Sequence, residues 1–349
     1  MSGPAASELD TAALGAWLAG RIDGLRLPLD VQRFSGGQSN PTFLLQDAQG
    51  QRFVLRKKPA GELLPSAHAV DREYRVMKAL EGTAVPVARM HSYCDDAAVI
   101  GTPFYVMAFV EGRIFWDPAL PELPAAQRAA LYQDMNRVVS ALHRIDPQAV
   151  GLADYGRTSN FFERQIGRWT RQYQAAATEP IAAMDKLIAW LPAHIPAREE
   201  TRIFHGDLRL DNMIFHPSEP RVLAVLDWEL STLGHPLADF AYHALPWRLS
   251  AQQFRGMADK DIAALGGIPS EQDYLRNYCA ATGRAIDAAE YEFCVAYSMF
   301  RLAAILQGIL KRAIDGTASS AQARETGQKA RGIAEMAWCQ VQTHFADAR

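Results

Sequence analysis

The chain has 349 residues, of which 49% are hydrophobic and 21% are charged, enough for two lobes with their own cores. Its formal net charge of -3 gives no electrostatic reason to expect a nucleic-acid partner. The start lacks a signal-peptide pattern, and the most apolar late segment, 299–314, is interrupted by Arg301, Gln307 and Lys311, so no membrane span is expected. Four cysteines without CxxC spacing suggest a cytoplasmic protein.

The first third of the chain predicts a small lobe rich in strands. Apolar residues at steps of four and three predict a helix over 11–25. Extended segments and turn residues then predict further elements in order: strands over 31–34, 42–46 and 52–56, a helix over 67–80, and a strand over 104–110. A turn sequence, Asp47-Ala48-Gln49-Gly50, separates the second strand from the third.

The remainder predicts a larger, mostly helical lobe. An apolar stripe from Leu131 to Ile145 is typical of an amphipathic helix. Helices are also expected over 161–176 and 184–191, short strands over 202–204, 213–215 and 221–226, and helices from Asp239 to the end. This order predicts an α+β fold with a β-rich lobe over 1–110 and a helical lobe over 111–349.

The segment 205–212, His-Gly-Asp-Leu-Arg-Leu-Asp-Asn, carries the strongest chemical signal. It places a carboxylate, Asp207, five residues before an amide, Asn212, and a second carboxylate, Asp227, ends a hydrophobic strand shortly afterwards. Phosphoryl transfer needs one group to orient and deprotonate a hydroxyl, and oxygen ligands to hold Mg²⁺ on ATP. We therefore interpret Asp207 as the catalytic base and Asn212 and Asp227 as magnesium ligands.

The order of these motifs resembles the aminoglycoside phosphotransferase and choline-kinase branch of the protein-kinase-like fold. That branch has HGD in place of HRD, and a Trp-Glu after its metal-binding Asp, as in Asp227-Trp228-Glu229. The downstream segment 234–239 also matches. The segments 55–59 and 66–74 look more narrowly like the phosphotransferase domain associated with acyl-CoA dehydrogenases of the ACAD10/ACAD11 type. The resemblance implies a bilobal kinase-like fold that uses ATP and Mg²⁺.

Three further residues near these motifs have expected roles. The resemblance implies that Asp239 is a structural anchor, and we expect His205 to support the catalytic loop as well. Arg209 matches the position of a protein-kinase Lys, so it is a candidate contact for the γ-phosphate. A solvated arginine is the alternative interpretation of Arg209.

A loop rich in small residues lies between the first two predicted strands. Its residues can offer backbone N–H groups and hydroxyls to phosphates, because glycine permits close approach. The candidate phosphate-binding residues are Ser35, Gly36, Gly37, Gln38, Ser39 and Asn40. The loop is neither a GxGxxG nor a Walker A sequence, so it is a weak signal by itself.

A cation on the next strand is expected to reach the α/β-phosphates and to pair with Glu73 on the following helix. Strand alternation places Arg56 and Lys57 on opposite faces. We favour Arg56, whose face aligns with the family's lysine, and Lys57 is the second choice. The resemblance further implies that the strand over 104–110 is the linker that holds adenine, with Met107, Ala108 and Val110 as its candidate contacts.

The other conspicuous residues are interpreted as structural. The histidines between 194 and 243 show no HxxxH or HExxH spacing, so His216, His235 and His243 are expected to be structural rather than zinc ligands. Late aromatic residues are expected in the core, with one or two lining the acceptor pocket: Trp247, Tyr278, Tyr291 and Tyr297.

These features predict an ATP- and Mg²⁺-dependent kinase of a small molecule with a hydroxyl group. From His243 onward there are 12 basic and 11 acidic residues, a net charge of +1, which disfavours a polycationic aminoglycoside. The ACAD-type resemblance implies a hydroxylated acid or its CoA thioester. An amino alcohol such as choline stays open, as does a nucleotide-binding pseudokinase or scaffold, which the arginine at position 56 would favour. The sequence does not indicate an oligomeric state.

Overall fold

The computed structural model describes residues 9–34, 40–59, 68–318 and 320–345. The chain forms two compact units. Unit 1 comprises residues 1–112 together with 223–229, and unit 2 comprises 113–222 and 230–349. The short return of the chain to unit 1 is the segment that carries Asp227.

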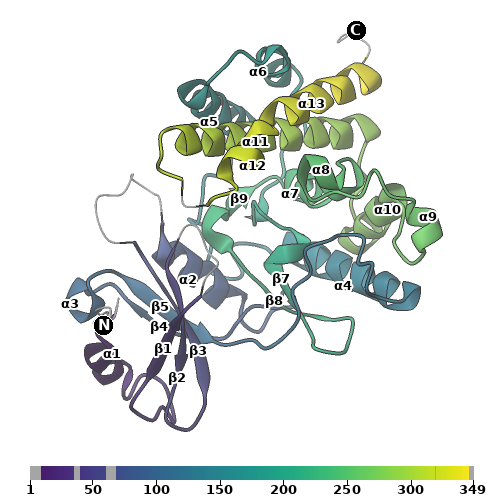
Figure 1. Ribbon diagram of the computed structural model, residues 1–349. Helices are drawn as coiled ribbons and strands as arrows, with labels where there is room; N and C mark the ends of the chain where they lie inside the picture. The colour runs from purple at the N-terminus through teal and green to yellow at the C-terminus, as the bar shows by residue number, and fades with distance from the viewer. Residues whose placement is uncertain (1–8, 35–39, 60–67, 319, 346–349) are drawn as a thin grey trace. The chain divides into compact units, whose positions relative to one another are not determined.

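Unit 1 is built on a five-stranded antiparallel sheet with the strand order β1-β2-β3-β5-β4 (Figure 1). Its elements are α1 (Thr11–Leu18), β1 (Asp30–Arg33), β2 (Thr42–Gln46), β3 (Arg52–Lys57), α2 (Val70–Leu80), β4 (Met90–Cys94), α3 (Ala97–Ile100) and β5 (Phe104–Ala108).

The turn between β2 and β3 fixes the register of the central hairpin. The Asp47 carboxylate accepts hydrogen bonds from the backbone N–H groups of Gln49, at 2.9 Å, and Gln51, at 2.8 Å. Gly50 has a φ of 83°, a left-handed conformation that glycine adopts without steric cost. This register pairs Thr42 with Arg56 across the two strands.

Helices α1 and α2 cover opposite faces of this sheet. Phe104 of β5 faces α1, where its ring lies 5.2 Å from that of Trp17. Tyr105, the next residue, faces α2 and lies 6.4 Å from the Tyr74 ring. Because alternate strand residues face opposite sides, β5 contributes to both layers.

The returning segment 223–229 is attached to unit 1 through its backbone. The Val225 N–H donates to the Pro86 carbonyl at 2.9 Å, and the Trp228 indole N–H donates to the Val225 carbonyl at 2.9 Å. Trp228 is only 1% exposed. Asp227 therefore follows a strand, β8 (Val222–Val225), and precedes a buried tryptophan that fixes the turn.

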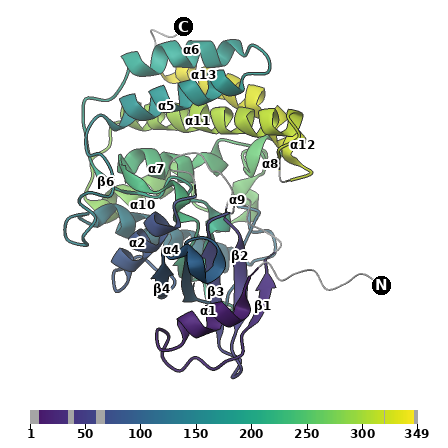
Figure 2. The ribbon, with the colours of Figure 1, turned by 90° about the vertical axis from the view of Figure 1, so that its left-hand side faces the viewer.

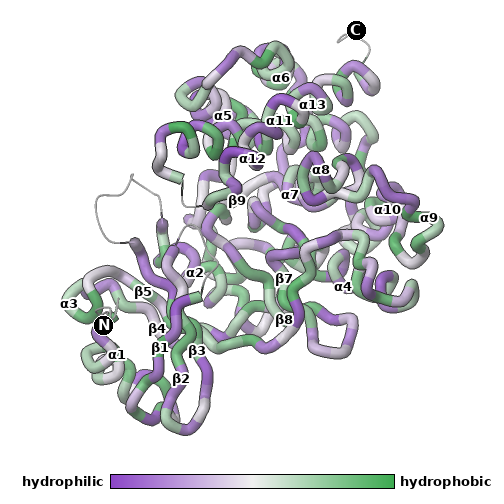
Figure 3. The backbone as a smooth tube through the Cα atoms, viewed as in Figure 1, coloured by the Kyte–Doolittle hydropathy of each residue, from purple (hydrophilic) through white to green (hydrophobic). Residues whose placement is uncertain are grey.

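Unit 2 consists mainly of helices, with short strands around the HGD segment (Figure 2). Its helices are α4 (Ala125–Arg144), α5 (Phe161–Ala176), α6 (Ala182–Ala193), α7 (Pro236–His243), α8 (Ala251–Phe254), α9 (Ile262–Leu265), α10 (Glu271–Thr282), α11 (Ala288–Ile314), α12 (Ala323–Gln328) and α13 (Ala330–His344). Its strands are β6 (Arg202–Phe204), β7 (Met213–Phe215) and β9 (Thr232–Gly234), and β6 pairs antiparallel with β9. Strand β7 is hydrophobic along its length (Figure 3).

Helix α11 forms the centre of unit 2. It packs against α5, α7, α12 and α13. Among the described residues it is the one helix with the length and composition to cross a membrane, yet 78% of its most apolar stretch is buried inside the protein. Its Arg301 is buried and donates to the Gly206 carbonyl, which links this core helix to the HGD segment.

Most predicted elements are present, and the differences have local causes. The first helix ends at Leu18 rather than at 25, because Gly20 and Gly24 adopt left-handed φ values of 78° and 79°. The last strand of unit 1 ends at Ala108 rather than at 110. Strands β4 and β9 were not predicted; β4 alternates poorly in burial and β9 has three residues.

Candidate active site

In unit 1 the functional side chains converge on Glu73, which α2 carries and which is 1% exposed. The Arg56 Nε atom lies 3.0 Å from Glu73 Oε2, and the Tyr105 hydroxyl donates to the same oxygen at 2.9 Å. The Asn40 side-chain amide donates to Glu73 Oε1 at 2.7 Å. Both oxygens of this buried carboxylate are thus satisfied, as burial of a charged group requires.

Arg56 bridges Glu73 to the segment that follows β8. Its Nη2 atom lies 3.0 Å from Asp227 Oδ1 and 3.4 Å from Glu229 Oε2. Burial alone would lower the pKa of Arg56, but Glu73, Asp227 and Glu229 outweigh it and raise the pKa above its ordinary value. The guanidinium is therefore a permanent cation held by three carboxylates.

Asp227 has an unusual backbone conformation, with a φ of 63°. Residues other than glycine rarely adopt this left-handed region, and such residues are often found at functional sites. One carboxylate oxygen, Oδ1, contacts Arg56. The other oxygen has no hydrogen-bond partner among the residues that the structure describes, so it is free to bind a cation.

The structure places Arg56, rather than Lys57, beside Glu73. Lys57 is 9% exposed, and its Nζ atom donates to the Ile100 carbonyl at 3.4 Å, on the opposite face of β3. The contact of Arg56 with phosphates stays a prediction.

The other predicted nucleotide contacts of unit 1 are placed only in part. Ser35, Gly36, Gly37, Gln38 and Ser39 lie outside the described residues. Asn40 is 1% exposed, and its Oδ1 atom lies 3.0 Å from His68 Nδ1, so its side chain is engaged within the protein.

The predicted adenine contacts lie at the end of β5. Met107 is 9% exposed and pairs with Val54 of β3, and Val110 follows the strand, half-buried. The Ala108 N–H donates to the Arg89 carbonyl at 2.8 Å and is therefore already satisfied. Their contact with adenine stays a prediction.

In unit 2 the Asp207 carboxylate accepts hydrogen bonds from three side chains. Tyr242 donates to Oδ1 at 2.9 Å, and Asn212 Nδ2 donates to Oδ2 at 2.9 Å. Arg209 spans both oxygens, with Nε 3.0 Å from Oδ1 and Nη2 3.0 Å from Oδ2. A carboxylate held in this way has a fixed orientation.

These donors also keep Asp207 ionised. Burial would raise the pKa of this carboxyl, but the Arg209 guanidinium, the Tyr242 hydroxyl and the Arg301 guanidinium outweigh burial and lower it. The same interaction raises the pKa of Tyr242, whose burial disfavours the phenolate. Asp207 is consequently a charged acceptor for a hydroxyl proton at neutral pH.

The HGD backbone is held by a second buried carboxylate, Asp239 on α7. Asp239 accepts the backbone N–H groups of His205, at 2.7 Å, and Gly206, at 2.9 Å, and its Oδ2 atom lies 3.3 Å from His143 Nε2. His205 Nδ1 in turn accepts the Asp207 N–H at 3.1 Å. These contacts place His205 and Asp239 behind the catalytic loop, as structural supports.

Gly206 satisfies a strict backbone requirement. Its φ is 86°, and a Cβ atom there would lie 3.0 Å from the Leu230 carbonyl oxygen. A side chain at this position would therefore be strained and crowded, which explains the glycine between His205 and Asp207.

The histidines expected to be structural have packing or turn contacts. His243 is bonded to the Leu208 carbonyl at 3.0 Å and to the Tyr274 hydroxyl at 2.8 Å. His216 accepts backbone N–H groups of the turn after β7, and His235 is buried beside Phe162. Among the described residues, no group of three His, Cys, Asp or Glu side chains could hold a metal ion.

Asn212 has the chemistry of a magnesium ligand. It belongs to a short 3-10 helix, η1 (Leu210–Asn212), and is 8% exposed. Its Nδ2 atom donates to the Asp207 backbone carbonyl and to its carboxylate, which turns the other end of the amide away from Asp207. Within the described residues Asn212 Oδ1 accepts no hydrogen bond. This free oxygen and the free oxygen of Asp227 are the hard donors that Mg²⁺ prefers.

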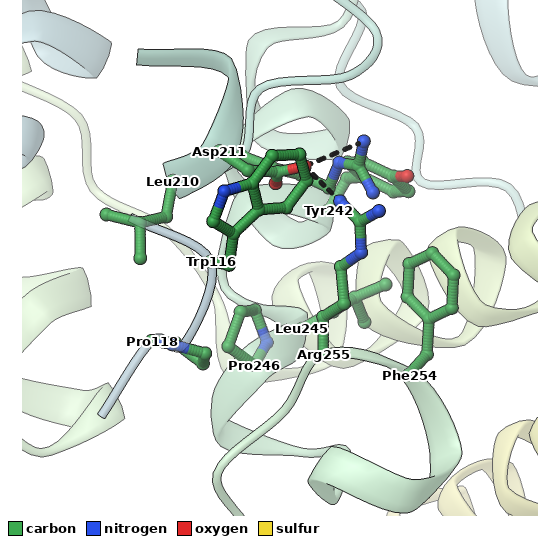
Figure 4. A pocket seen from close by; sticks show the side chains of 10 residues that line it. Trp116, Pro118, Leu210, Asp211, Tyr242, Leu245, Pro246, Phe254 and Arg255 are labelled. Atoms are coloured by element: carbon green, nitrogen blue, oxygen red, sulfur yellow. Dashed lines mark hydrogen bonds and ion pairs between the residues drawn. The ribbon is translucent and has the colours of Figure 1, made fainter. Parts of the chain in front are cut away.

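A pocket lies beside Asp207 in unit 2, and the sequence did not predict most of its lining (Figure 4). Arg209 and Tyr242, which contact Asp207, form one side, and Trp116, Phe254 and Arg255 form another. None of the late aromatic residues proposed for the acceptor pocket lines it: Trp247, Tyr278, Tyr291 and Tyr297. Those residues pack in the core, with Tyr278, Tyr291 and Tyr297 at most 4% exposed.

Comparison with known proteins decides the family. The model of the phosphotransferase enzyme family (APH) matches residues 30–278, most of the chain. This chain belongs to the phosphotransferase enzyme family. The predicted kinase-like α+β fold is therefore confirmed, and the chain is a phosphotransferase, while the predicted hydroxyl acceptor stays a prediction.

Several curated relatives of this chain are named as acyl-CoA dehydrogenase family members. Acyl-CoA dehydrogenase family member 10 of Mus musculus is 49% identical over 314 residues, which are 89% of this chain and 29% of the relative. Acyl-CoA dehydrogenase family member 11 of Gallus gallus is 45% identical over 311 residues, 88% of this chain and 40% of the relative. The chain thus spans less than half of the length of these relatives.

Solved structures extend the comparison. A protein of Ralstonia eutropha JMP134, described as a candidate aminoglycoside phosphotransferase, is 54% identical, with a TM-score of 0.88 over 96% of this chain and 99% of that one. Aminoglycoside phosphotransferase APH(4)-Ia, in a complex with AMP-PNP and hygromycin B, is 15% identical, with a TM-score of 0.61 over 95% of this chain and 99% of that one. The second likeness shows the fold alone.

Proposed function

We propose that this phosphotransferase is an ATP- and Mg²⁺-dependent kinase that transfers the γ-phosphoryl group to a hydroxyl of a small molecule. The observation that carries the proposal is the environment of Asp207. Its carboxylate is largely buried yet kept ionised by Arg209 and Tyr242, and Asp239 accepts the backbone N–H groups of His205 and Gly206. Such a carboxylate orients an acceptor hydroxyl and takes its proton as the phosphoryl group arrives.

The remaining roles follow from the chemistry of each residue. Asn212 and Asp227 would hold Mg²⁺, which neutralises charge on the phosphates when it is bound. Arg56, oriented by Glu73, would bind phosphate oxygens through its planar guanidinium. Arg209 is the candidate cation for the γ-phosphate. In this structure its guanidinium is paired with Asp207 and Asp211.

For the acceptor we propose a hydroxylated acid or its CoA thioester. The support is that curated relatives are named acyl-CoA dehydrogenase family members. The distribution of charge agrees, since the chain from His243 onward carries a net charge of +1 and offers no acidic surplus for a polycation.

The experiment is ATP consumption in the presence of hydroxy acids, hydroxyacyl-CoAs, amino alcohols and aminoglycosides. With the acceptor that supports turnover, Asp207→Asn is expected to lower kcat by about a thousandfold, since general base catalysis contributes about 10²–10⁴. Asp185→Asn, a change of an exposed aspartate on α6, should leave kcat unchanged. Binding of Mg·ADP to both variants, measured by calorimetry, controls for folding. A kcat for Asp207→Asn above a tenth of the wild-type value contradicts the mechanism.

A further inference from the structure

The pocket that Arg209 and Tyr242 line adjoins a second cavity, which has a volume of about 360 Å³. The two cavities share Trp116, Pro118, Phe254 and Arg255, and together they are called the groove. The inner end is lined by Arg209 and Tyr242, the two side chains that bond Asp207. The outer end is lined by Asp117, Gly256, Thr326 and Lys329. Every one of these residues belongs to unit 2.

The backbone around Arg255 is built to place its side chain in this groove. Arg255 follows helix α8 with a φ of 47°, an uncommon conformation for a residue with a side chain. The next residue must be glycine, because a Cβ atom on Gly256 would lie 1.7 Å from the Leu249 carbonyl oxygen. The tight turn therefore fixes the direction in which Arg255 leaves the helix.

Arg255 and Trp116 line both cavities, and Figure 4 shows them in the inner one. The Arg255 guanidinium lies 5.3 Å from the centre of the Trp116 ring and 5.8 Å from that of Phe254. It is also paired with Asp211, which in turn contacts Arg209. Trp116 is 64% exposed, so much of its indole surface is left open by the residues that the structure describes. An exposed aromatic face beside a cation is a surface for an apolar body that carries a charge.

The charges at the outer end leave a positive excess. Asp117 is neutralised by Lys260, whose Nζ atom lies 2.6 Å from Oδ2. Lys329 is half-buried, and in the described part of the chain its ammonium has neither an ion pair nor a hydrogen bond. An unpaired cation in the lining of a cavity favours an anionic ligand, because opposite charges attract across the contact.

We propose that the groove is the acceptor site and that its outer end binds an anionic group, a carboxylate or a phosphate, at a distance from the reacting hydroxyl. The hydroxyl lies at the inner end beside Asp207, the apolar body lies along Trp116 and Phe254, and the anion pairs with Lys329 and Arg255. This inference rests on the proposed kinase function. A polycationic acceptor is disfavoured, because its far end would meet the unpaired ammonium of Lys329.

The test uses four alcohols with the same six-carbon body and different far ends: ω-hydroxyhexanoate, ω-hydroxyhexyl phosphate, hexanediol and ω-aminohexanol. Their binding to the protein with Mg·ADP is measured by calorimetry. We expect at least one anionic alcohol to bind about tenfold more tightly than hexanediol, the effect of one ion pair of about 1.4 kcal/mol, and ω-aminohexanol to bind most weakly. The two anionic alcohols distinguish a carboxylate site from a phosphate site.

Lys329→Ala should lower the affinity for the preferred anionic alcohol about tenfold and leave the affinity for hexanediol unchanged. Lys311→Ala, on the surface of α11, is the matched control and should bind like the wild type. The inference is wrong if ω-aminohexanol binds as well as the anions, if no anionic alcohol binds, or if Lys329→Ala changes nothing. If Asp207→Asn abolishes turnover of an acceptor but the anionic alcohols do not bind more tightly than hexanediol, the kinase function is supported and the anion site is wrong. If the anionic alcohols bind as expected but none of the acceptors tested is phosphorylated, the proposed kinase function is wrong.

Discussion

Glu73 in unit 1 and Asp207 in unit 2 are carboxylates whose pKa values move in opposite directions. Burial raises the pKa of Glu73 in spite of its ion pair with Arg56. Burial also acts on Asp207, but Arg209, Tyr242 and Arg301 outweigh it and lower its pKa. Burial decides the pKa of Glu73 and the neighbouring donors decide that of Asp207, so the two values move in opposite directions.

The two carboxylates also differ in their contact with solvent. Glu73 is closed on all sides by Arg56, Tyr105 and Asn40, so it positions other groups and makes no contact with solvent. Asp207 is partly exposed and lies against the lining of a pocket. The first arrangement is typical of a structural ion pair and the second of a group that meets a substrate.

The strongest test of this comparison is Glu73→Ala. The change leaves Arg56, Asn40 and Tyr105 buried without their acceptor, so we expect the free energy of unfolding to fall by about 3–5 kcal/mol. Urea unfolding measures it. The control is Glu111→Ala, whose carboxylate is 71% exposed and pairs with Arg52, and which should cost less than about 1 kcal/mol. Equal decreases in the free energy of unfolding for the two variants would show that the buried contacts of Glu73 do not stabilise the fold more than an exposed ion pair does.

A second test concerns the support of the Asp207 loop by His243. Burial lowers the pKa of His243 to about 4, from an ordinary value of 6.5, so the folded protein keeps it neutral. Between these values the unfolded chain binds the proton and the folded one does not, so stability is complete above pH 6.5 and is lost as the pH falls toward 4. The shift corresponds to about 3 kcal/mol.

The measurement is the free energy of unfolding in urea at pH 7.5 and at pH 4.5, for the wild type and for His243→Gln. The variant should be less stable at pH 7.5, because it loses the bonds to Leu208 and Tyr274, and should lose less stability on acidification than the wild type. The same loss on acidification in both proteins would contradict the assignment.

The smallest expected effect is that of Tyr242→Phe. Removing the hydroxyl that donates to Asp207 should raise the pKa of this carboxyl, and the acid limb of the kcat/KM profile should move to higher pH by about one unit. Tyr278→Phe, which removes a buried hydroxyl bonded to His143, is the control and should leave the limb in place. An unmoved limb in Tyr242→Phe would remove Tyr242 from the set that tunes Asp207.

Local sequence patterns predicted the parts of the fold whose determinants are close in the chain. The hairpin of β2 and β3 depends on a turn of adjacent residues around Asp47, and the helices α5 and α6 depend on their own apolar periodicity. The HGD segment and Asp227 were recognisable because their chemistry requires particular residue types at a fixed order. Strand β4 was missed because its sequence, MHSYC, has no clear alternation.

The choice between Arg56 and Lys57 shows where local reasoning ends. Alternation establishes that they face opposite ways, but only the position of α2 decides which face meets Glu73. The groove poses the same difficulty. Trp116, Arg209 and Arg255 lie far apart in sequence, and only Arg209 belongs to a motif, so their convergence depends on the packing of unit 2. The one local signal was the Arg255-Gly256 pair after a short helix.

The return of residues 223–229 to unit 1 has a consequence for how this protein can be divided. Its chain passes from unit 1 to unit 2, back, and again to unit 2, so neither unit is a continuous stretch of the gene. A fragment that ends at Gly112 would lack Asp227 and the Val225 bond to Pro86, and the complementary fragment would carry that segment without its partners. A single cut in the chain therefore cannot separate the two units intact.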